Sequence, residues 1–157
     1  MGKELKTNAI RILDRAKIEY KINTYKCDEF IDAVKIADML NQPYENSYKT
    51  LVAKGKNDYF VFCVPIAQEL DMKKAAKSVN QKAVELISVK EINSVTGYVR
   101  GGCTPIGMKK QFKTIIDITA QNIDTIIISG GRIGTQIFMS PNDLAQIVNA
   151  EFIDIIK

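Results

Sequence analysis

Apolar side chains recur along the chain with two different spacings, which alternate from one segment to the next. Near the start, Ile10, Leu13 and Ala16 follow one another at helical spacing, and Thr7 stands where an N-terminal cap is expected. The same spacing recurs in later segments, bounded by residues that cap or end helices, such as Asp71. The pattern predicts helices over 7–16, 30–40, 71–79, 89–96 and 140–148.

Runs rich in β-branched and aromatic residues separate these helices. YKTLVA at 48–53 and YFVFCV at 59–64 are joined by KGKND, whose glycine, asparagine and aspartate favour a turn, so we expect a hairpin. TIIDI at 114–118 and DTIIISGG at 124–131 are almost continuously apolar, which is typical of strands buried on both faces. Further strands are expected over 20–24, 136–139 and 152–156.

This mixture of elements favours an α/β mixed (α+β) fold. The hairpin argues against a doubly wound sheet made of parallel strands only, because parallel neighbours need long crossover connections. The chain has 157 residues, within the usual range of a single core, and neither a linker nor an internal repeat interrupts it. We therefore expect one domain over residues 1–157.

Composition and charge narrow the classes of function. The 22 lysines and arginines exceed the 18 aspartates and glutamates, and a net charge of +4 favours an anionic partner without requiring one. Histidine is absent, which removes the usual general base at neutral pH and the commonest metal ligand. The three cysteines are far apart and form no CxxC pair. No metal site is predicted.

The sequence shows no sign of a targeting or membrane segment. Its first residues, MGKELKTNAI, are too polar for a signal peptide, and no apolar run approaches the ~18 residues of a membrane-spanning helix. Sparse cysteines in odd number suit a reducing compartment. We expect a cytoplasmic protein that does not bind the membrane.

A lysine inside a predicted strand is the first candidate for a site. Lys49 lies in YKTLVA, and most lysines in strands point to solvent. Alternation indicates the opposite, because Lys49 shares one face with Leu51 and Ala53, where a buried residue is expected. A lysine on a buried face usually lines a pocket for an anion or a carbonyl oxygen. These residues alone leave both interpretations open.

The most unusual stretch is GYVRGGCTPIGMKKQ at 97–111. Gly101 and Gly102 permit backbone conformations closed to other residues, and Pro105 fixes the exit, so this loop can direct several N–H groups into one cavity. An ordinary long surface loop is an equally good interpretation. No identifiable group activates the thiol of Cys103, so a catalytic thiolate is not favoured.

Two further features indicate anion binding less strongly. Arg100, Lys109 and Lys110 would ordinarily be solvated, although cations beside a glycine loop can contact phosphates. GGRIGTQ follows a predicted strand, but it has neither the Walker A spacing nor the dinucleotide-binding spacing, and it leads into another strand. A tight turn with a bulge is the simpler interpretation of these glycines.

Together, three motifs resemble the YbaK/EbsC family of free-standing aminoacyl-tRNA deacylases, relatives of the editing domain of bacterial prolyl-tRNA synthetases. The motifs are YKTLVA, TGYVRGGCTPIGMKKQ and SGGRIGTQIFMSPNDL, in the family's order. The similarity runs from residue 6 to residue 156. It implies a mixed, strongly curved, barrel-like sheet flanked by helices. It also implies hydrolysis of the ester between an amino acid and the 3′ end of tRNA, without a metal or organic cofactor.

The resemblance further implies a substrate and a partner. The best-known activity of the YbaK branch removes cysteine from mischarged Cys-tRNA(Pro), beside prolyl-tRNA synthetase. The alternatives are a deacylase for Ala-tRNA(Pro) or of broader specificity, and a non-catalytic module that binds tRNA or a nucleotide. In a site without a protein nucleophile, the family's chemistry has the thiol of the substrate attack its own carbonyl.

Positions that match the family motifs give the expected site residues. Lys49 matches the lysine that helps to bind the terminal adenosine and to orient the ester. The family's Gly-Gly-x-x-Pro loop matches Gly101, Gly102 and Pro105, and its amides are expected to hold the developing oxyanion. The other expected pocket residues are Tyr20, Phe30, Ser129, Gly130 and Gly131, and the expected tRNA contacts are Arg100, Lys109 and Lys110.

The chain departs from the family pattern at two places. Many relatives carry R-G-L-D before the last strand, with an aspartate implicated in activity, whereas this chain has Gln136 there. A neutral amide donates and accepts hydrogen bonds but cannot act as a general base. Cys103 and Thr104 stand where a pair such as Ile-Ser is common. Of all the expectations, the choice of substrate depends most on these two positions.

Overall fold

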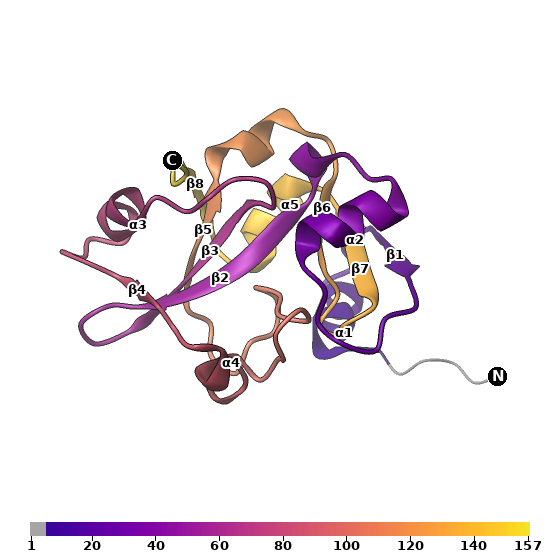
Figure 1. Cartoon of the computed structure of the whole chain (residues 1–157), viewed down its shortest axis with the longest axis horizontal. Coiled ribbons are helices and arrows are strands. Elements are labelled where there is room, and N and C mark those ends of the chain that lie inside the picture. Colours follow the sequence, from indigo (N-terminus) through magenta and orange to yellow (C-terminus); the bar gives the residue numbers. More distant parts are fainter. Residues whose placement is uncertain (1–5) are drawn as a thin grey trace.

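The structure, a computed structural model, describes residues 6–157 and alternates helices with strands (Figure 1). Its α-helices are α1 (Asn8–Arg15), α2 (Ala33–Leu40), α3 (Met72–Ser78), α4 (Val89–Thr96) and α5 (Pro141–Ile147). Each lies within one of the ranges that the apolar spacing predicts, and the α+β class is confirmed. None of the helices within residues 6–157 has the length and apolar character needed to cross a membrane.

Capping side chains fix where the helices begin. Thr7 accepts a hydrogen bond from the amide of Ile10 at 3.2 Å and starts α1 as predicted. The helix predicted from residue 30 begins only at Ala33, because Asp32 caps it by accepting from the amide of Val34 at 3.1 Å. The residues just before this cap therefore stay in an irregular segment, which contributes to the cavity described below.

The larger of two sheets is mixed. Its strand order is β4-β2-β3-β5-β8, and β2 and β3 form the predicted antiparallel hairpin. The β3–β5 and β5–β8 pairs are parallel. These strands are β2 (Tyr48–Lys54), β3 (Tyr59–Pro65), β4 (Glu85–Leu86), β5 (Lys113–Asp117) and β8 (Glu151–Ile153).

The smaller sheet changes the expected picture of one barrel-like sheet. It is antiparallel, with the order β1-β7-β6, and consists of β1 (Tyr20–Thr24), β6 (Ile126–Ser129) and β7 (Thr135–Met139). A tight turn pairs β6 with β7, and β1 takes the other side of β7. An isolated parallel bridge between Ser47 and Ile127 links the two sheets. The strands therefore form two open sheets and do not close into a barrel.

Three short elements escaped the spacing analysis, because a two-residue strand and such short 3₁₀ helices show no clear period. They are β4 and the 3₁₀ helices η1 (Tyr44–Asn46) and η2 (Ile118–Asn122). Two strands were also predicted too long. The strand expected over 124–131 ends where its glycines form a turn, and the one expected over 152–156 is the short β8.

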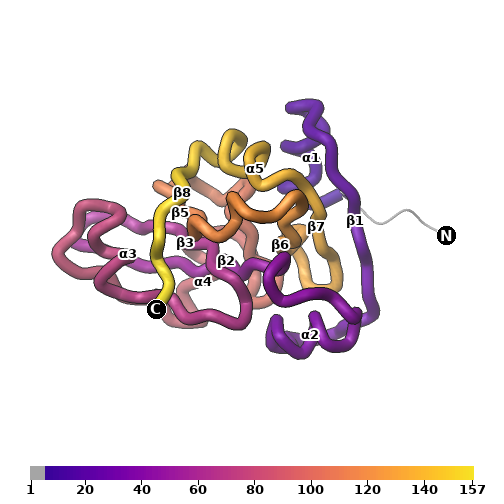
Figure 2. The backbone as a smooth tube through the Cα atoms, turned by 90° about the horizontal axis from the view of Figure 1, so that it is seen from above, coloured from indigo at the N-terminus to yellow at the C-terminus, as the bar shows by residue number. Residues whose placement is uncertain are grey.

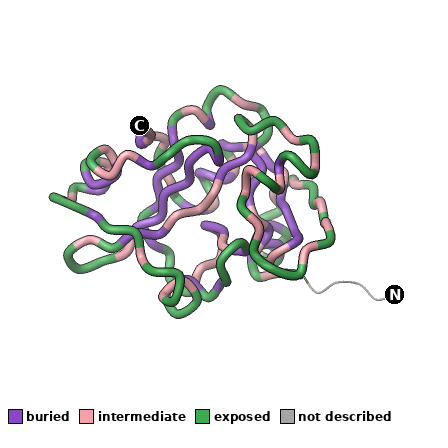
Figure 3. The backbone as a smooth tube through the Cα atoms, in the orientation of Figure 1, coloured by how far each residue is buried: buried purple, intermediate pink, exposed green. Residues whose placement is uncertain are grey.

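The buried residues form three clusters, of which the largest includes residues of both sheets. One cluster packs α1 and α5 on the smaller sheet around Ile10, Ile128 and Leu144, and another packs α3 on the larger sheet around Phe62 and Ala75. Buried segments follow the strands and exposed segments form the outer loops (Figure 3). The helix α3 and strand β4 lie at one end of the molecule, while α1 and β1 lie at the other (Figures 1 and 2).

Candidate active site

A cavity of about 350 Å³ is walled by both sheets. Its lining comes from β2, the residues around the start of α2, the loop at 100–103, and β6 and β7. The predicted site residues that line it are Phe30, Lys49, Arg100, Gly101, Ser129 and Gln136. The fold thus brings residues from all three sequence motifs to one cavity.

Lys49 lines this cavity from β2, where it is half-buried and stands opposite Val64 of β3. Both faces of this strand are covered by protein: Leu51 beside Lys49 lines the cavity and Ala53 is 0% exposed, while Val52 on the other face is 6% exposed. Within residues 6–157, the Lys49 ammonium has no hydrogen bond or ion pair with the protein. An unpaired ammonium in a largely apolar cavity can bind an anionic or carbonyl oxygen.

Arg100 and Phe30 stack on each other at the edge of the cavity. The guanidinium carbon lies 3.9 Å from the centre of the Phe30 ring, within the range of a cation–π contact. Both side chains are exposed although both residues line the cavity, so they stand at its opening. A guanidinium at this place is suited to meet a phosphate group of an incoming ligand.

The two amides of the glycine loop differ in whether they are hydrogen-bonded within the protein. Gly101 has a φ of 85°, and a Cβ there would lie 3.0 Å from the Phe30 ring. The Gly101 amide has no acceptor among the described residues, whereas that of Gly102 donates to the carbonyl of Val99 at 2.9 Å. A Cβ on Gly102 would lie 2.8 Å from the Cα of Arg132, so this glycine allows two loops to pack closely. Of the two predicted donors, Gly101 retains an amide for a ligand.

The SGG segment forms the turn between β6 and β7, as the simpler interpretation of its glycines predicts. The amide of Gly130 donates to the carbonyl of Thr135 at 2.8 Å, and the amide of Gly131 donates to Oγ of Ser129 at 3.3 Å. Ser129 lines the cavity, whereas Gly130 and Gly131 lie outside its lining. Because both amides are bonded within the turn, this segment shapes the wall and offers the Ser129 hydroxyl.

Gln136 is held in a network of side-chain amides. Its Oε1 accepts from Nε2 of Gln42 at 2.9 Å and from Nδ2 of Asn23 at 3.1 Å, while its Nε2 donates to Oε1 of Gln42 at 3.0 Å. The Gln136 side chain is 8% exposed. A neutral, bonded amide pair thus occupies the position for which the motif resemblance implies an aspartate in many relatives, and it provides no general base.

Tyr20 and Pro105 lie outside the cavity lining. The hydroxyl of Tyr20 donates to Asp14 at 2.5 Å, and burial together with this hydrogen bond raises the pKa of Tyr20 to about 12. Pro105 is buried in the loop after the glycines. Tyr25 and Tyr48, not Tyr20, are the tyrosines that line the cavity.

The two predicted basic contacts after the glycine loop also lie outside the lining. The Lys109 ammonium donates to the carbonyl of Ser94 at 3.2 Å. The Lys110 ammonium lies 3.8 Å from a carboxylate oxygen of Asp58, in the turn between β2 and β3. Both side chains are exposed, so they can meet only parts of a ligand that extend beyond the cavity.

The family of the chain follows from a comparison with known proteins. A family model described as the aminoacyl-tRNA editing domain matches residues 29–147, which include every cavity residue named above except Tyr25. The chain belongs to this family. The resemblance that the three motifs carry is therefore confirmed, and the cavity of this chain lies within its editing domain.

Relatives of this editing domain include free-standing proteins and parts of larger enzymes. A protein of Enterococcus faecalis, EbsC, named as a candidate Cys-tRNA(Pro)/Cys-tRNA(Cys) deacylase, is 40% identical over 152 residues, covering 96% of this chain and 93% of the relative. The proline–tRNA ligase of Fervidobacterium nodosum is 30% identical over 98 residues, covering 62% of this chain and 17% of the ligase.

A solved structure confirms the fold. It is described as a candidate trans-editing enzyme for prolyl tRNA synthetase, and it superimposes with a TM-score of 0.84 at 20% sequence identity. The match covers 98% of this chain and 99% of the other. The architecture of two sheets around a cavity is therefore that of a known editing fold.

Some cavity residues of the editing domain were missed by sequence reasoning. Asp32 is the only acidic residue among the described residues of the lining, and Gln42 is the partner of Gln136. The signal for Asp32 was its position before a helix, although that position predicts a cap and not a pocket. Gln42 had no local signal, because its role depends on a strand far along the chain. Within residues 6–157, no group of three or more His, Cys, Asp or Glu side chains could hold a metal ion.

Cys103 lines the cavity. Burial raises the pKa of its thiol to about 11, with a smaller opposing effect from a hydrogen bond with Thr96. The thiol is therefore protonated at neutral pH. A protonated, half-buried thiol is a poor nucleophile, so the attacking group must come from elsewhere.

Proposed function

We propose that this editing domain is a trans-editing deacylase that hydrolyses the ester of mischarged Cys-tRNA(Pro), which prevents incorporation of cysteine at proline codons. The Enterococcus faecalis relative named for this activity supports the choice of substrate. The observation that carries the proposal is an unpartnered Lys49 ammonium and an open Gly101 amide in one cavity. The chain acts as a single domain.

Lys49 and Gly101 act on the ester carbonyl. Its oxygen gains negative charge as the carbonyl carbon is attacked, and a nearby ammonium and amide stabilise that charge in a cavity with little water. Ser129 uses its Oγ to accept from Gly131, which leaves its O–H free to donate to the substrate. Gln136 closes the opposite wall as a neutral group. Positioning and charge stabilisation are sufficient because an aminoacyl ester is already activated.

The substrate supplies the attacking group. Cys103 is protonated at neutral pH and Gln136 is not a base, so neither of these cavity residues is a nucleophile or base. The thiol sulfur of the cysteinyl group attacks its own carbonyl carbon, and the bond from that carbon to the ribose oxygen breaks. The ribose oxygen receives the thiol proton, and a cysteine thiolactone leaves. Water then opens the thiolactone to cysteine.

The tRNA end enters past Arg100 and Phe30. Arg100 contacts the backbone near the terminal adenosine, and the exposed Lys109 and Lys110 contact phosphates further from the ester. A net charge of +4 is small for a protein that binds tRNA alone. Prolyl-tRNA synthetase, which produces the mischarged tRNA, is therefore the proposed partner, and the cytoplasm is the proposed location.

Single-turnover deacylation tests this function. Hydrolysis of Cys-tRNA(Pro), Ala-tRNA(Pro) and Pro-tRNA(Pro) is followed with and without the protein, and early products are identified by mass spectrometry. We expect the cysteinyl ester to be hydrolysed fastest, with thiolactone appearing before free cysteine. Equal rates for the alanyl ester would identify a broader deacylase. Binding of charged tRNA with an unchanged ester half-life would identify a non-catalytic module.

A further inference from the structure

The cavity lining contains charged groups of both signs. Among residues 6–157, its cations are Lys49 and Arg100, and its only carboxylate is Asp32. The end of an aminoacyl-tRNA carries the complementary set: an anionic phosphodiester, a carbonyl oxygen that becomes negative, and a cationic α-ammonium next to the ester. In the proposed reaction Lys49 binds the carbonyl oxygen and Arg100 binds the phosphodiester. Asp32 has no role in the proposed reaction so far.

The Asp32 carboxylate has capacity for a ligand. Its Oδ2 accepts from the amide of Val34 at 3.1 Å and caps α2, and no other hydrogen bond or ion pair of this carboxylate occurs within residues 6–157. Among the described residues Arg100 forms no ion pair with Asp32, and its guanidinium stacks on Phe30 instead. An ionised carboxylate accepts at two oxygens, so Oδ1 remains for an incoming donor.

The wall of amides cannot replace Asp32. Gln136 is neutral, and its oxygen already accepts from Gln42 and Asn23. The Ser129 hydroxyl is also neutral. Selective binding of an ammonium group requires an anion or a set of free acceptors, and a charge-assisted hydrogen bond is the stronger of the two.

We infer that Asp32 binds the α-ammonium group of the aminoacyl ester and selects substrates with a free amino group over N-acylated ones. This inference rests on the proposed function. The cap at Val34 fixes the carboxylate at the start of α2, and Phe30, two residues earlier, places it near the opening through which the tRNA end enters. The carboxylate thereby orients the amino acid while Lys49 and Gly101 hold the carbonyl oxygen.

The test compares cysteinyl-tRNA(Pro) with N-acetyl-cysteinyl-tRNA(Pro) for wild type and Asp32→Asn. Asparagine is as good a helix cap as aspartate, so this change removes the charge and keeps the cap. We expect kcat/KM for the free-amino substrate to fall about fivefold or more, as for loss of one charge-assisted contact. The change for the acetylated substrate is expected to stay below about twofold. Equal changes for both substrates, or no change for either, would overturn the inference.

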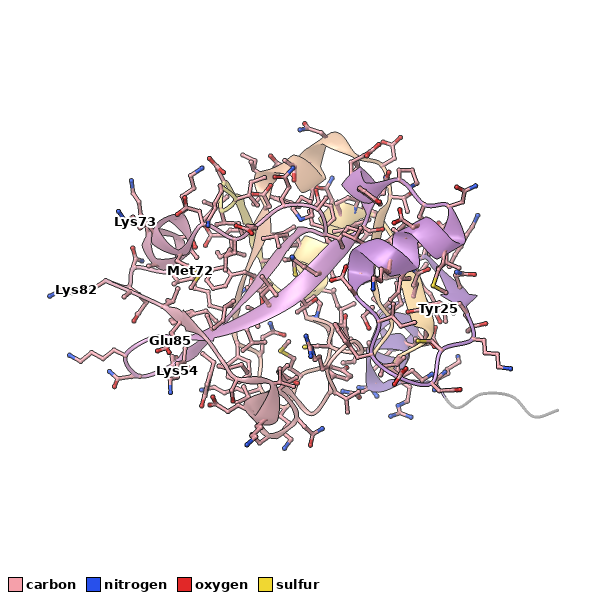
Figure 4. The ribbon with its side chains drawn as sticks, in the orientation of Figure 1. Tyr25, Lys54, Met72, Lys73, Lys82 and Glu85 are labelled. Carbon is pink, nitrogen blue, oxygen red and sulfur yellow. The ribbon has the colours of Figure 1, made fainter. Side chains whose placement is uncertain are left out.

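Asp71→Asn is the matched control. Asp71 caps α3 by accepting from the amides of Lys73 and Lys74 at 3.0 Å, and it lies outside the cavity lining. Figure 4 shows Lys73 at the end of the molecule opposite the cavity residue Tyr25. This variant should leave the ratio of the two rates at its wild-type value. A shift equal to that of Asp32→Asn would show that the ratio reports helix capping.

Binding of a stable analogue separates this inference from the proposed reaction. 3′-Deoxy-3′-(cysteinylamino)adenosine has an amide in place of the ester, and calorimetry compares it with its N-acetyl derivative. Tighter binding of the free-amino analogue to wild type, lost in Asp32→Asn, supports the inference even if no ester is hydrolysed. Ester hydrolysis by a protein that binds both analogues equally would refute the role of Asp32 and leave the proposed function standing.

Discussion

The two sides of the cavity differ in how many of their polar groups have hydrogen-bond partners within the protein. On the side of β2 and the loop at 100–103, the Lys49 ammonium and the Gly101 amide have no partner within the described residues. On the side of β6 and β7, the side-chain amides of Gln136 and Gln42 each donate to and accept from the other, and Oγ of Ser129 accepts from the amide of Gly131. One wall keeps its donors open, and the other bonds most of its polar groups within the protein.

This difference indicates where the chemistry lies. Lys49 is half-buried and Gly101 is exposed, so water can satisfy both donors in the free protein and a ligand can replace that water, whereas the amides of Gln136 and Gln42 are already bonded to each other. We therefore propose that the wall of β2 acts on the substrate and that the wall of β6 and β7 maintains the shape of the cavity. Substitutions on the first wall should change rates more than stability, and those on the second wall should do the reverse.

Lys49→Ala gives the largest expected effect. Removing the ammonium takes away charge stabilisation of the oxyanion, so kcat/KM for Cys-tRNA(Pro) should fall about 100-fold to 1000-fold. The free energy of unfolding should change by less than about 0.5 kcal/mol, because the ammonium has no partner in the protein. Single-turnover deacylation and urea denaturation measure the two quantities.

Lys54→Ala is the control on the same strand. Lys54 is exposed at the end of β2, and Figure 4 shows it far from Tyr25 of the cavity. Its removal should leave the rate within about twofold of wild type. A loss of tRNA affinity without loss of single-turnover rate in Lys49→Ala would contradict the catalytic assignment and favour a binding module.

Gln136→Leu tests the opposite wall. Leucine removes the hydrogen bonds to Gln42 and Asn23 and leaves their amides without partners, so unfolding should become easier by about 1–3 kcal/mol. The deacylation rate of the folded protein should fall less than tenfold, well below the effect expected at Lys49. Gln146→Leu, on an exposed position of α5, is the control for adding an apolar side chain. A rate loss as large as that of Lys49→Ala would remove the distinction between the walls.

The sequence predicted most helices and strands. It also predicted the residues on the β2 side of the cavity better than those on the side of β6 and β7. Periodicity located the main helices and strands, because each buries one regular face. Lys49 and Gly101 could be found because a lysine on a buried strand face and paired glycines are local departures from the usual pattern. The division into two sheets could not be found, because strand order depends on contacts between distant segments.

Residues of the bonded wall were harder to predict. Gln136 could be recognised only as a departure from the family motif, and its partner Gln42 has no local signal. Tyr20 was expected in the pocket, but Tyr25 lines it instead. No residue of β1, which carries Tyr20, is in the lining, and Tyr25 is the residue that follows this strand. The amide of Gly102 was expected to be open, but a turn to Val99 engages it. Gln42 and Gln136 lie far apart in the sequence, so the spacing of residues could not predict their hydrogen bonds.

Cys103 gives a prediction about alkaline pH. Burial raises the pKa of its thiol from an ordinary 9.0 to about 11, so the folded protein keeps a proton that the unfolded chain loses. Unfolding therefore releases a proton between pH 9 and pH 11, and stability must fall as the pH rises through this range. The contribution of this thiol should be about 2 kcal/mol by pH 11.

Cys103→Ala isolates that contribution. Urea denaturation at pH 8 and at about pH 10.5 should show a smaller alkaline loss of stability in the variant than in wild type. Cys63, whose thiol pKa burial raises to about 12, remains in both proteins and contributes equally. Identical pH dependence in the two proteins would show that folding does not raise the pKa of the Cys103 thiol.

Arg100→Gln gives the smallest expected effect, because Arg100 stands at the opening and not beside the ester. Loss of one phosphate contact should raise KM about threefold to fivefold and leave kcat unchanged, and the slope of log affinity against log salt should fall by about 0.7. Lys82→Gln, which removes an exposed charge at the far end of the molecule, is the control for net charge (Figure 4). If kcat fell as well, Arg100 would have to act on the reacting group, and the open wall would extend to the mouth of the cavity. A change confined to KM and salt dependence limits the catalytic part of that wall to Lys49 and Gly101.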